Sequence, residues 1–388
     1  MIATALDQFR EAIAETLGVA DDAVTLFARG RVALYAILQG LSIGPGDEVL
    51  VPAFTCVAVP NAILYSGARP VWVDIDERTL TLDPDALEAA ITPRSRVIVA
   101  QTTFGLSADL DAIMRIAARH DVTVVDDCTH GLGGRYHGTP NGATAPLSFF
   151  STQWSKPIST GLGGFAIALD PTVARRLRAI EATAAEPSAT RSAALHLLYV
   201  GRERAGHGRL LRYGRAAYRT LSRGGVVPGS SSLVELEGSS MPKGFLTRLS
   251  GPQANLGLQG LAGLAAQVQR RRSIARYYSG WLLANGRAPA YEPAGSEHAY
   301  LRYPLRVTAR DTFRAAAHHR GIDLGDWFRS PIHPITDGLE RWGYRPGAAP
   351  RAERVCREIV NLPTDPTLRD REVERVIALL AEHRTVIR

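Results

Sequence analysis

The chain has 388 residues, of which 45% are hydrophobic and 21% are charged, and these proportions are ordinary for a soluble globular protein. The length is sufficient for two domains and a large core. No apolar run is long enough to span a bilayer, and the first residues lack the basic and then apolar pattern of a signal peptide.

Charge and cysteine content indicate where the protein works. The net charge is +7, and the segment from Arg191 to Arg223 carries all of it, because it holds eight arginines and a single acid, Glu203. The rest of the chain is therefore close to neutral. Three widely spaced cysteines, at positions 56, 128 and 356, show no metal-ligand pattern and are typical of a reducing compartment. We expect a cytoplasmic protein.

The predicted elements alternate along the first half of the chain. An amphipathic helix is expected at the start, because apolar residues recur at helical spacing from Leu6 to Leu17. Further on, apolar runs predict strands over 48–53, 70–76, 96–101, 122–127 and 165–170, and helical patterns predict helices over 61–67, 83–91 and 108–120. Buried strands joined by helices indicate an α/β fold, with a mostly parallel sheet between helices.

The second half of the sequence is less regular. Residues 185–245 are rich in Arg, Ser and Gly, so we expect helical pieces joined by loops. A long helix is predicted from Ser250 to Leu283, then a strand over 300–307 and a helix over 371–383. These patterns predict a large domain over 1–250, with a basic insert at about 185–245. A smaller C-terminal α+β domain is expected over 251–388, with the long helix as its bridge.

Lys156 lies five residues before the glycine-rich run 161–164. A surface lysine in a loop is the ordinary interpretation of such a residue. Its neighbours, however, are uncharged, and it is one of only two lysines in a chain that otherwise uses arginine. A lysine amine can lose its proton and form a Schiff base, which arginine cannot do.

Asp127 ends the predicted strand 122–127, upstream of Lys156. A carboxylate at the end of a buried strand can hold a proton on the pyridine nitrogen of pyridoxal phosphate, the cofactor that bonds to a lysine amine. Ligands of such sheets collect at the carboxyl ends of the strands. Asp127 and its neighbour Asp126 can equally cap the turn after the strand, and His130 can be a hydrogen-bonded loop histidine.

Two other places offer candidate sites. Asp74 and Asp76 close the predicted strand 70–76; a metal pair is one interpretation, but a turn at the strand end explains them better, because no further ligands cluster nearby in the sequence. The segment 30–38 predicts a helix that begins with Gly30. Free N–H groups at the start of such a helix can bind a phosphate.

Taken in chain order, the motifs resemble one family. They are the Gly-x-x-Ala-Leu helix start at Gly30, GPGDEVLVPAFT at 44–55, the VDID strand end, Asp-x-x-His at 127–130, Ser-x4-Lys at 151–156, and TGLGG at 160–164. This set resembles the DegT/StrS-type sugar aminotransferases, and GPQANLGLQGL at 251–261 and NLPTDPTL at 361–368 look like later segments of that family. The resemblance implies a fold-type-I pyridoxal phosphate-dependent transferase.

The resemblance also implies a role for each matching residue. Lys156 would bond to pyridoxal 5'-phosphate and carry protons, and Asp127 would pair with the pyridine nitrogen. His130 would reach the phenolic oxygen of the ring. The phosphate would be bound by Ser151 and by the helix start at Arg31 and Val32. No metal site is expected.

The chain departs from the family at three positions. Arg31 stands where the family usually has a small or hydroxyl-bearing residue. Cys56 stands where the family has an aromatic residue that stacks on the cofactor ring, so this stacking is lost or supplied from elsewhere. Leu246 stands where the family has an asparagine donated by the partner subunit, although Arg248 of that motif is kept.

The expected function is amino transfer from glutamate or glutamine to a keto-sugar, possibly nucleotide-linked, or to a related cyclic ketone. A dehydratase or another eliminating enzyme with the same cofactor is one alternative, although family members that act as dehydratases have histidine in place of the lysine. A non-catalytic regulatory or binding protein of the same fold is another. The joint presence of Lys156, Asp127, His130 and Ser151 argues against it. A homodimer is expected, because fold-type-I enzymes complete their pockets with a neighbour's loops.

The basic segment 191–223 has three interpretations. It is a solvated surface that covers the site, a lid that attracts a diphosphate-bearing substrate, or a peripheral membrane contact in which leucine and tyrosine side chains interleave with arginine. Nucleic-acid binding is not expected, since no recognised module accompanies the charge.

Overall fold

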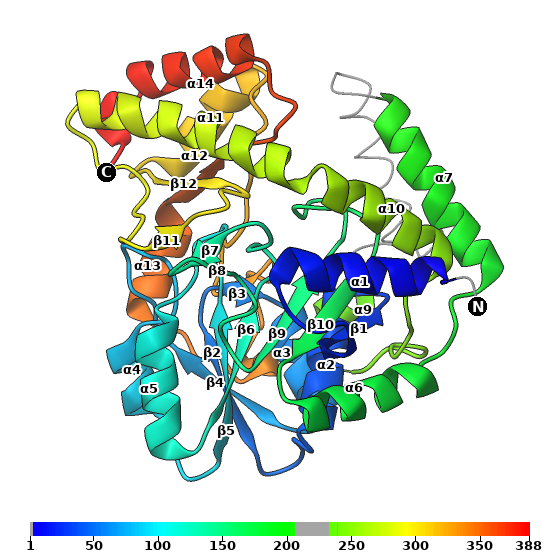
Figure 1. Cartoon of the computed structure of the whole chain (residues 1–388). Coiled ribbons are helices and arrows are strands. Elements are labelled where there is room, and N and C mark those ends of the chain that lie inside the picture. Colours follow the sequence, from blue (N-terminus) through cyan, green and yellow to red (C-terminus); the bar gives the residue numbers. More distant parts are fainter. Residues whose placement is uncertain (1–2, 206–232, 239) are drawn as a thin grey trace.

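The computed structural model describes residues 3–205, 233–238 and 240–388. A large sheet lies between helices, and a second group of helices and short strands is formed by the C-terminal part of the chain (Figure 1). Most of the basic segment 191–223, including the arginines from 209 to 223, lies outside the described residues, and so do the expectations that concern it.

The large sheet has seven strands in the order β1-β10-β9-β6-β5-β2-β4. Their bounds are β1 Val24–Phe27, β2 Glu48–Pro52, β4 Arg69–Val73, β5 Ser95–Gln101, β6 Thr123–Asp127, β9 Leu147–Ser151 and β10 Gly164–Ala168. The strands from β4 to β9 pair in parallel, whereas β10 runs antiparallel to β9 and to β1. The predicted mostly parallel sheet is confirmed, and β1 and β9 are additional to the predicted strands.

The strand register brings three distant residues to one edge of the sheet. Asp127, the last residue of β6, lies opposite Phe149 in the parallel pair with β9. Ser151 ends β9 and lies opposite Gly164, the first residue of β10. The carboxyl ends of β6 and β9 and the beginning of β10 therefore meet at the same edge.

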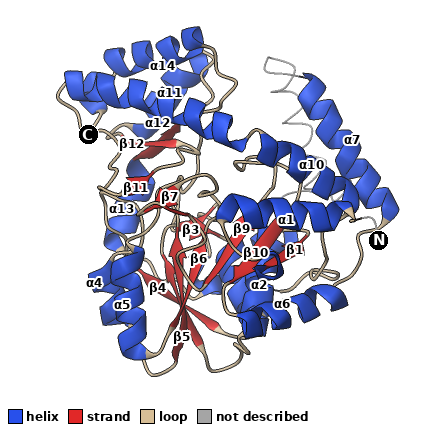
Figure 2. Ribbon diagram, in the orientation of Figure 1, coloured by secondary structure: helices blue, strands red, loops and turns tan. Residues whose placement is uncertain are grey.

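Helices cover both faces of this sheet (Figure 2). They are α2 (Gly30–Gly40), α3 (Ala58–Tyr65) and α6 (Pro171–Thr183) on one face, and α4 (Pro84–Ala90) and α5 (Leu110–His120) on the other. The alternation of side chains along a strand explains the two cores. In β5, Val97 and Val99 pack into the core with α2, whereas Ile98 and Ala100 pack into the core with α5.

The predicted N-terminal helix is α1 (Ala5–Leu17). Its first turn is closed by a capping box between Thr4 and Asp7. Phe9 is buried against α10 (Gly251–Ala262), where a methyl group on Gly257 would lie 2.4 Å from the Phe9 ring. Gly257 therefore allows the close approach, and burying a side chain such as Phe9 contributes about 2 kcal/mol.

The single long helix predicted from Ser250 to Leu283 is wrong. The structure has two helices, α10 and α11 (Leu264–Ala284), which meet at Gly263. α10 packs against α1, whereas α11 contributes Ile274 and Tyr278 to the C-terminal core (Figure 1). The first turns of α11, with Leu264 and Val268, still pack in the core shared by α1 and α10, and α11 enters the C-terminal core from Ile274 onward.

Beyond α11, the C-terminal part contains β12 (Tyr303–Arg306), α12 (Arg310–His319), α13 (Pro350–Glu358), β14 (Ile359–Leu362) and α14 (Asp370–Glu382), and β12 runs antiparallel to β14. The helices α11, α12 and α14 pack around this two-stranded sheet, whereas α13 packs in a separate core with Phe54 and Trp342. β12 and α14 correspond to the predicted strand and helix. One short strand, β13 (Ile332–His333), leaves this group and pairs in parallel with β3 (Thr55–Cys56). A segment of the C-terminal part thereby pairs with the chain just after β2, in a separate two-stranded sheet.

The remaining elements are short. A small sheet contains β7 (Arg135–Tyr136), β8 (Thr139–Pro140) and β11 (Ser296–Glu297), and the 3-10 turns are η1 (Asp21–Ala23), η2 (Leu339–Trp342) and η3 (Arg384–Val386).

The two ends of the basic insert are helical, as expected. They are α7 (Ala189–Ala205), which extends along one side of the molecule (Figure 1), and α9 (Leu233–Glu237). On α7, Leu195 is buried and Leu197 is 71% exposed. The Tyr199 ring stacks on the Trp154 ring, with 6.1 Å between the ring centroids. Within the described ranges, no helix combines the length and the apolar character that crossing a membrane requires.

Candidate active site

Lys156 is held in a closed loop between β9 and β10. The loop ends are tied by a hydrogen bond of 2.7 Å between the hydroxyls of Thr152 and Thr160, and the N–H of Thr160 also donates to the Thr152 carbonyl. A methyl group on Gly163 would lie 2.3 Å and 2.4 Å from these two hydroxyls. The glycine-rich run therefore lets the loop close, and the loop places Lys156 at the sheet edge that carries Asp127.

The Lys156 amine is positioned to react as a neutral base. Removal from water lowers its pKa to about 8, and the charge of Arg31 acts in the same direction. Asp127 and Cys56 oppose the shift, which shows that all three groups lie within electrostatic reach of the amine. With this pKa, about one molecule in ten carries a neutral amine at pH 7. The unshifted amine would be almost wholly protonated.

Asp127 and Asp126 lie next to each other on β6 but have different surroundings. One oxygen of the buried Asp127 accepts the N–H of Thr129 at 3.0 Å, so Asp127 does cap the turn after its strand. Burial raises the pKa of Asp127 above its usual value, although the hydrogen bonds from Thr129 and the charge of Lys156 oppose this shift. Asp126 accepts the Thr102 hydroxyl at 3.2 Å, and burial raises its pKa to about 7.

His130 is held by a backbone hydrogen bond and lies within electrostatic reach of Lys156. Its Nδ1 accepts the backbone N–H of Phe104 at 3.3 Å. Burial lowers its pKa well below the usual value, and the charges of Lys156 and Arg302 act in the same direction. The imidazole is therefore neutral, and because Nδ1 accepts a hydrogen bond, the ring proton is carried by Nε2.

The start of α2 forms a cradle beside Ser151. A methyl group on Gly30 would lie 3.0 Å from Cβ of Ser151, and one on Gly164 would lie 2.3 Å from the Gly30 nitrogen. The first turn of the helix, including Arg31 and Val32, is therefore pressed against the end of β9 and the beginning of β10. Helix N-termini bind phosphate because their first N–H groups have no partner within the helix.

The guanidinium of Arg31 has a carboxylate partner that the sequence did not reveal. It bonds to Glu235 of α9, a fully buried residue, and Arg29 reaches the same carboxylate at 3.4 Å. The backbone carbonyl of Glu235 also accepts the side-chain amide of Asn61 at 2.8 Å. The end of the basic insert is thus docked at the start of α2.

An aromatic side chain from the C-terminal part completes the surroundings of Lys156. The Trp327 ring stacks on His130 with 4.7 Å between centroids, and the Lys156 Nζ atom lies 5.4 Å from the Trp327 centroid. The Arg302 guanidinium lies 5.5 Å from the same ring. No periodicity or motif marks Trp327, Arg302 or Glu235 in the sequence, because each is brought to the site from a distant segment.

The other two departures from the family pattern, Cys56 and Leu246, lie in different surroundings. Cys56 is in β3, beside the site, and is free, like the other two cysteines. Leu246 packs on the core of the large sheet, next to Phe245, whose ring contacts Tyr35 and Tyr65.

Asp74 and Asp76 are occupied by turn and helix contacts. Asp76 accepts the N–H groups of Arg78 and Thr79, and Asp74 accepts those of Ile75 and Ala352. In the part of the chain that the structure describes, no three His, Cys, Asp or Glu side chains are grouped to hold a metal ion.

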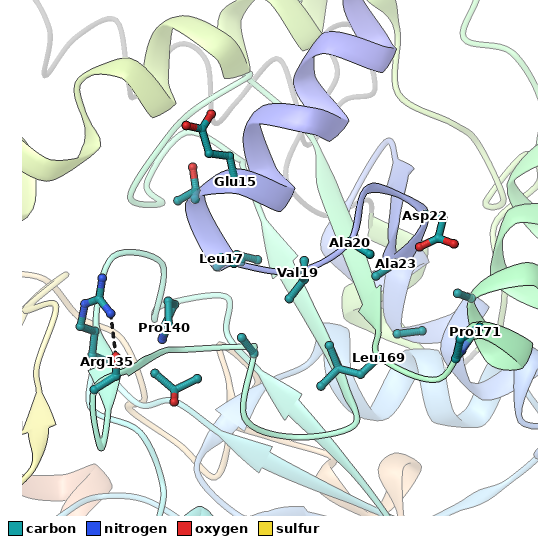
Figure 3. A pocket seen from close by; sticks show the side chains of 17 residues that line it. Glu15, Leu17, Val19, Ala20, Asp22, Ala23, Arg135, Pro140, Leu169 and Pro171 are labelled. Atoms are coloured by element: carbon teal, nitrogen blue, oxygen red, sulfur yellow. Dashed lines mark hydrogen bonds between the residues drawn. The ribbon is translucent and has the colours of Figure 1, made fainter.

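A cavity of about 640 Å³ lies away from these residues (Figure 3). It is lined by the end of α1, by the hairpin around Arg135 and by the end of β10 near Leu169. Because Ala168 ends the strand that begins at Gly164, the cavity is at the sheet edge opposite Lys156. We do not assign it to the site.

Together, the residues at the Lys156 edge fit one cofactor. They offer an amine that can lose its proton, a buried carboxylate, a neutral imidazole with an N–H donor, and a helix N-terminus beside a serine hydroxyl. This set matches the aldehyde, pyridine nitrogen, phenolic oxygen and phosphate of pyridoxal phosphate.

Comparison with known proteins agrees with this chemistry. Residues 3–381 match the DegT/DnrJ/EryC1/StrS aminotransferase family. The GDP-perosamine synthase of Caulobacter vibrioides is 36% identical over 387 residues, which cover 96% of this chain and 88% of that protein. The UDP-N-acetyl-3-dehydro-alpha-D-glucosamine 3-aminotransferase of Acidithiobacillus ferrooxidans is 28% identical, with coverage of 91% and 82%.

The fold is shared with solved structures as well. DesV of S. venezuelae superposes with a TM-score of 0.77 at 27% identity, and the match covers 98% of this chain and 90% of that chain.

Proposed function

This chain belongs to the DegT/DnrJ/EryC1/StrS aminotransferase family, and we propose that it uses pyridoxal phosphate to move an amino group from glutamate or glutamine to a keto-sugar. The names of two relatives contain GDP- and UDP-linked sugars, which supports a nucleotide-linked acceptor in sugar, polysaccharide or secondary-metabolite biosynthesis.

The observation that carries the proposal is the placement of Lys156. Its amine, with a pKa near 8, lies within electrostatic reach of Asp127 at the edge where β6 and β9 end. A protein that only bound a sugar would gain nothing from a partly neutral lysine near a buried carboxylate. An aminotransferase needs both groups.

The residues divide the work. The cofactor, when bound, supplies an electron sink for the carbon that loses its proton. Asp127 keeps the proton on the pyridine nitrogen, which strengthens that sink. Lys156 would hold the cofactor covalently and would carry the proton to and from the reacting carbon. His130 would donate from Nε2 to the phenolic oxygen, and Ser151 and the first turn of α2 at Arg31 and Val32 would hold the phosphate.

An absorption spectrum of the purified protein tests this function. A visible band should form with pyridoxal phosphate and be lost on addition of L-glutamate or L-glutamine, with release of the matching keto acid. Lys156→Ala should show neither the band nor turnover. A wild-type protein that gives no band, or a Lys156→Ala variant that turns over normally, would contradict the proposal.

The same experiment separates the alternatives. A band that every amino donor leaves unchanged would favour dehydration or another elimination, and a protein that does not take up the cofactor would be a binding or regulatory protein of this fold. Lys156 favours transamination over the dehydratases of the family, which have histidine at this position.

The expected setting of the enzyme is also part of the proposal. We infer a cytoplasmic homodimer with a large domain over 1–250 and a small domain over 251–388. The three free cysteines support a reducing compartment, and the core formed by residues 274–387 supports a separate C-terminal unit. The pairing of β13 with β3 means that contacts cross the proposed boundary.

A further inference from the structure

Position 56 leaves one side of the proposed cofactor site without its usual aromatic group. The family stacks an aromatic side chain on the cofactor ring there, and Cys56 is too small to do so. The strand that carries Cys56 is, however, paired with a segment of the C-terminal part, since His333 of β13 lies opposite Cys56 in the register. The backbone bonds that join them run from Thr55 N–H to the Pro331 carbonyl and from Val57 N–H to the His333 carbonyl.

The same segment carries Trp327 into the site. Its indole is partly buried, lies nearly parallel to the His130 imidazole, with 20° between the planes, and approaches the Lys156 amine to 5.4 Å from the ring centroid. His130 and Lys156 are the two groups expected at the phenolic oxygen and at the aldehyde carbon of the cofactor. A large aromatic surface thus lies beside the position of the cofactor ring.

The backbone holds Trp327 in place independently of its side chain. The Trp327 N–H donates to Oδ1 of Asn361 at 2.9 Å, and the Gly325 N–H donates to the Asn361 carbonyl at 2.9 Å. Asn361 is fully buried in β14. Replacing the indole therefore leaves the anchors of the loop intact, which makes the residue suitable for substitution.

We propose that Trp327 supplies the aromatic face against which the ring of pyridoxal phosphate packs, in place of the side chain missing at position 56. This inference rests on the proposed function, because it concerns the same cofactor. It means that the stacking group has moved from β3 to the C-terminal part, so cofactor binding and the pairing of β13 with β3 stabilise each other.

Titration of the cofactor-free protein with pyridoxal phosphate tests the proposal. Trp327→Ala should raise the dissociation constant for pyridoxal phosphate about tenfold, which is the size expected for loss of an aromatic pair. Trp327→Phe keeps an aromatic face and should stay close to the wild type. Trp281→Phe is the matched control, since Trp281 packs on the C-terminal core in α11, and it should not change the dissociation constant.

Tryptophan fluorescence provides a readout that a merely structural role would not move. The fluorescence of an indole in contact with the cofactor is quenched in the loaded protein. Trp327→Phe should therefore lower the emission of the cofactor-free protein and leave the emission of the loaded protein unchanged, whereas Trp281→Phe should lower both. This comparison stays valid even if Trp327→Ala does not fold.

Two results would overturn the inference while leaving the proposed function standing. One is a wild-type dissociation constant in Trp327→Ala, including the case in which only the KM for the acceptor rises. The other is a Trp327→Phe protein whose loaded form loses emission as Trp281→Phe does. Failure of the wild-type protein to take up pyridoxal phosphate would instead reject the proposed function, and the inference with it.

Discussion

Arg31 and Glu235 form an ion pair at the start of α2, with the Glu235 side chain fully buried. The pair joins the proposed phosphate cradle to α9, the last described piece of the basic insert before residue 240. A buried carboxylate is stable only when its partners satisfy it, and Arg29 adds a second contact at 3.4 Å. Removing the acid leaves two arginines in a region that excludes water.

Glu235→Ala should therefore lower the free energy of unfolding by about 3 kcal/mol, the cost typical of breaking a buried pair. Urea unfolding of the cofactor-free protein measures it. The control is Glu186→Ala, which removes the 75% exposed partner of Arg248 and should change stability little, because exposed pairs contribute little. Equal effects of the two substitutions would contradict the importance of the buried pair.

Asp127 and Asp126 provide a second matched comparison. Asp127→Asn should slow the donor half-reaction about 100- to 1,000-fold, the range seen when one preorganised electrostatic contact is lost, and should weaken cofactor binding much less. Asp126→Asn, which changes the carboxyl bonded to Thr102, should leave the rate close to that of the wild type. Stopped-flow absorbance with L-glutamate measures both. A normal rate in Asp127→Asn would reject its role.

The lowered pKa of Lys156 sets the pH dependence of cofactor attachment. Only the neutral amine reacts, so the rate of covalent bond formation should rise with pH and level off above a midpoint near 8, rather than near the ordinary 10.5. Borohydride trapping followed by mass spectrometry measures the bond. Lys243, the other lysine, is exposed and should remain unlabelled. A midpoint near 10.5 would show that the site does not lower the pKa of the Lys156 amine.

The fit of the glycine-rich run against α2 can be tested with two alanine substitutions. Gly164→Ala places a methyl group 2.3 Å from the Gly30 nitrogen, so it should lower stability by about 1–3 kcal/mol, as overpacking does, and weaken cofactor binding by displacing the helix start. Gly251→Ala meets nothing within 4 Å and should do neither. Thermal unfolding and cofactor titration measure these effects. A stable, tightly binding Gly164→Ala protein would contradict the close contact.

Much of this fold can be predicted because the signal is local. The apolar runs that became β2, β5, β6 and β10 are buried on both faces, so their composition alone marks them. The strand β1 is only four residues long, and β9 directly precedes the Lys156 loop, so neither stands out. The break at Gly263 could not be predicted, because the apolar spacing continues across it to Leu264 and Val268.

The site divides in the same way. Lys156, Asp127, His130 and Ser151 are recognisable because they lie within thirty residues of one another, at or just after the ends of the neighbouring strands β6 and β9. Glu235 and Trp327 arrive through nonlocal contacts, the first by docking α9 on α2 and the second by pairing β13 with β3. The spacing of apolar residues in the sequence does not predict such contacts. Cys56 indicates only that the family's stacking aromatic side chain is absent at that position.

A buried histidine outside the site should make stability depend on pH. His298 accepts the N–H of Tyr300 at 2.8 Å and stacks on its ring at 3.8 Å. Burial lowers its pKa to about 3, and the charge of Arg272 acts in the same direction. In the unfolded chain the pKa is about 6.5. Between these two pKa values the His298 imidazole is protonated in the unfolded chain and neutral in the folded chain, so the free energy of unfolding falls as pH falls.

The size of this effect follows from proton linkage. Below pH 6.5 the His298 contribution should decline by about 1.4 kcal/mol per pH unit, which amounts to about 2 kcal/mol between pH 7.5 and pH 5.0. His298→Gln cannot take up the proton, so the stability difference between wild type and variant should shift by this amount in favour of the variant. Urea unfolding at the two pH values measures it. Other titrating groups, such as His130 and His333, are present in both proteins and cancel in the comparison. A difference that is the same at both pH values would show that the folded chain accepts the proton on His298, and that this ring is less enclosed than its contacts indicate.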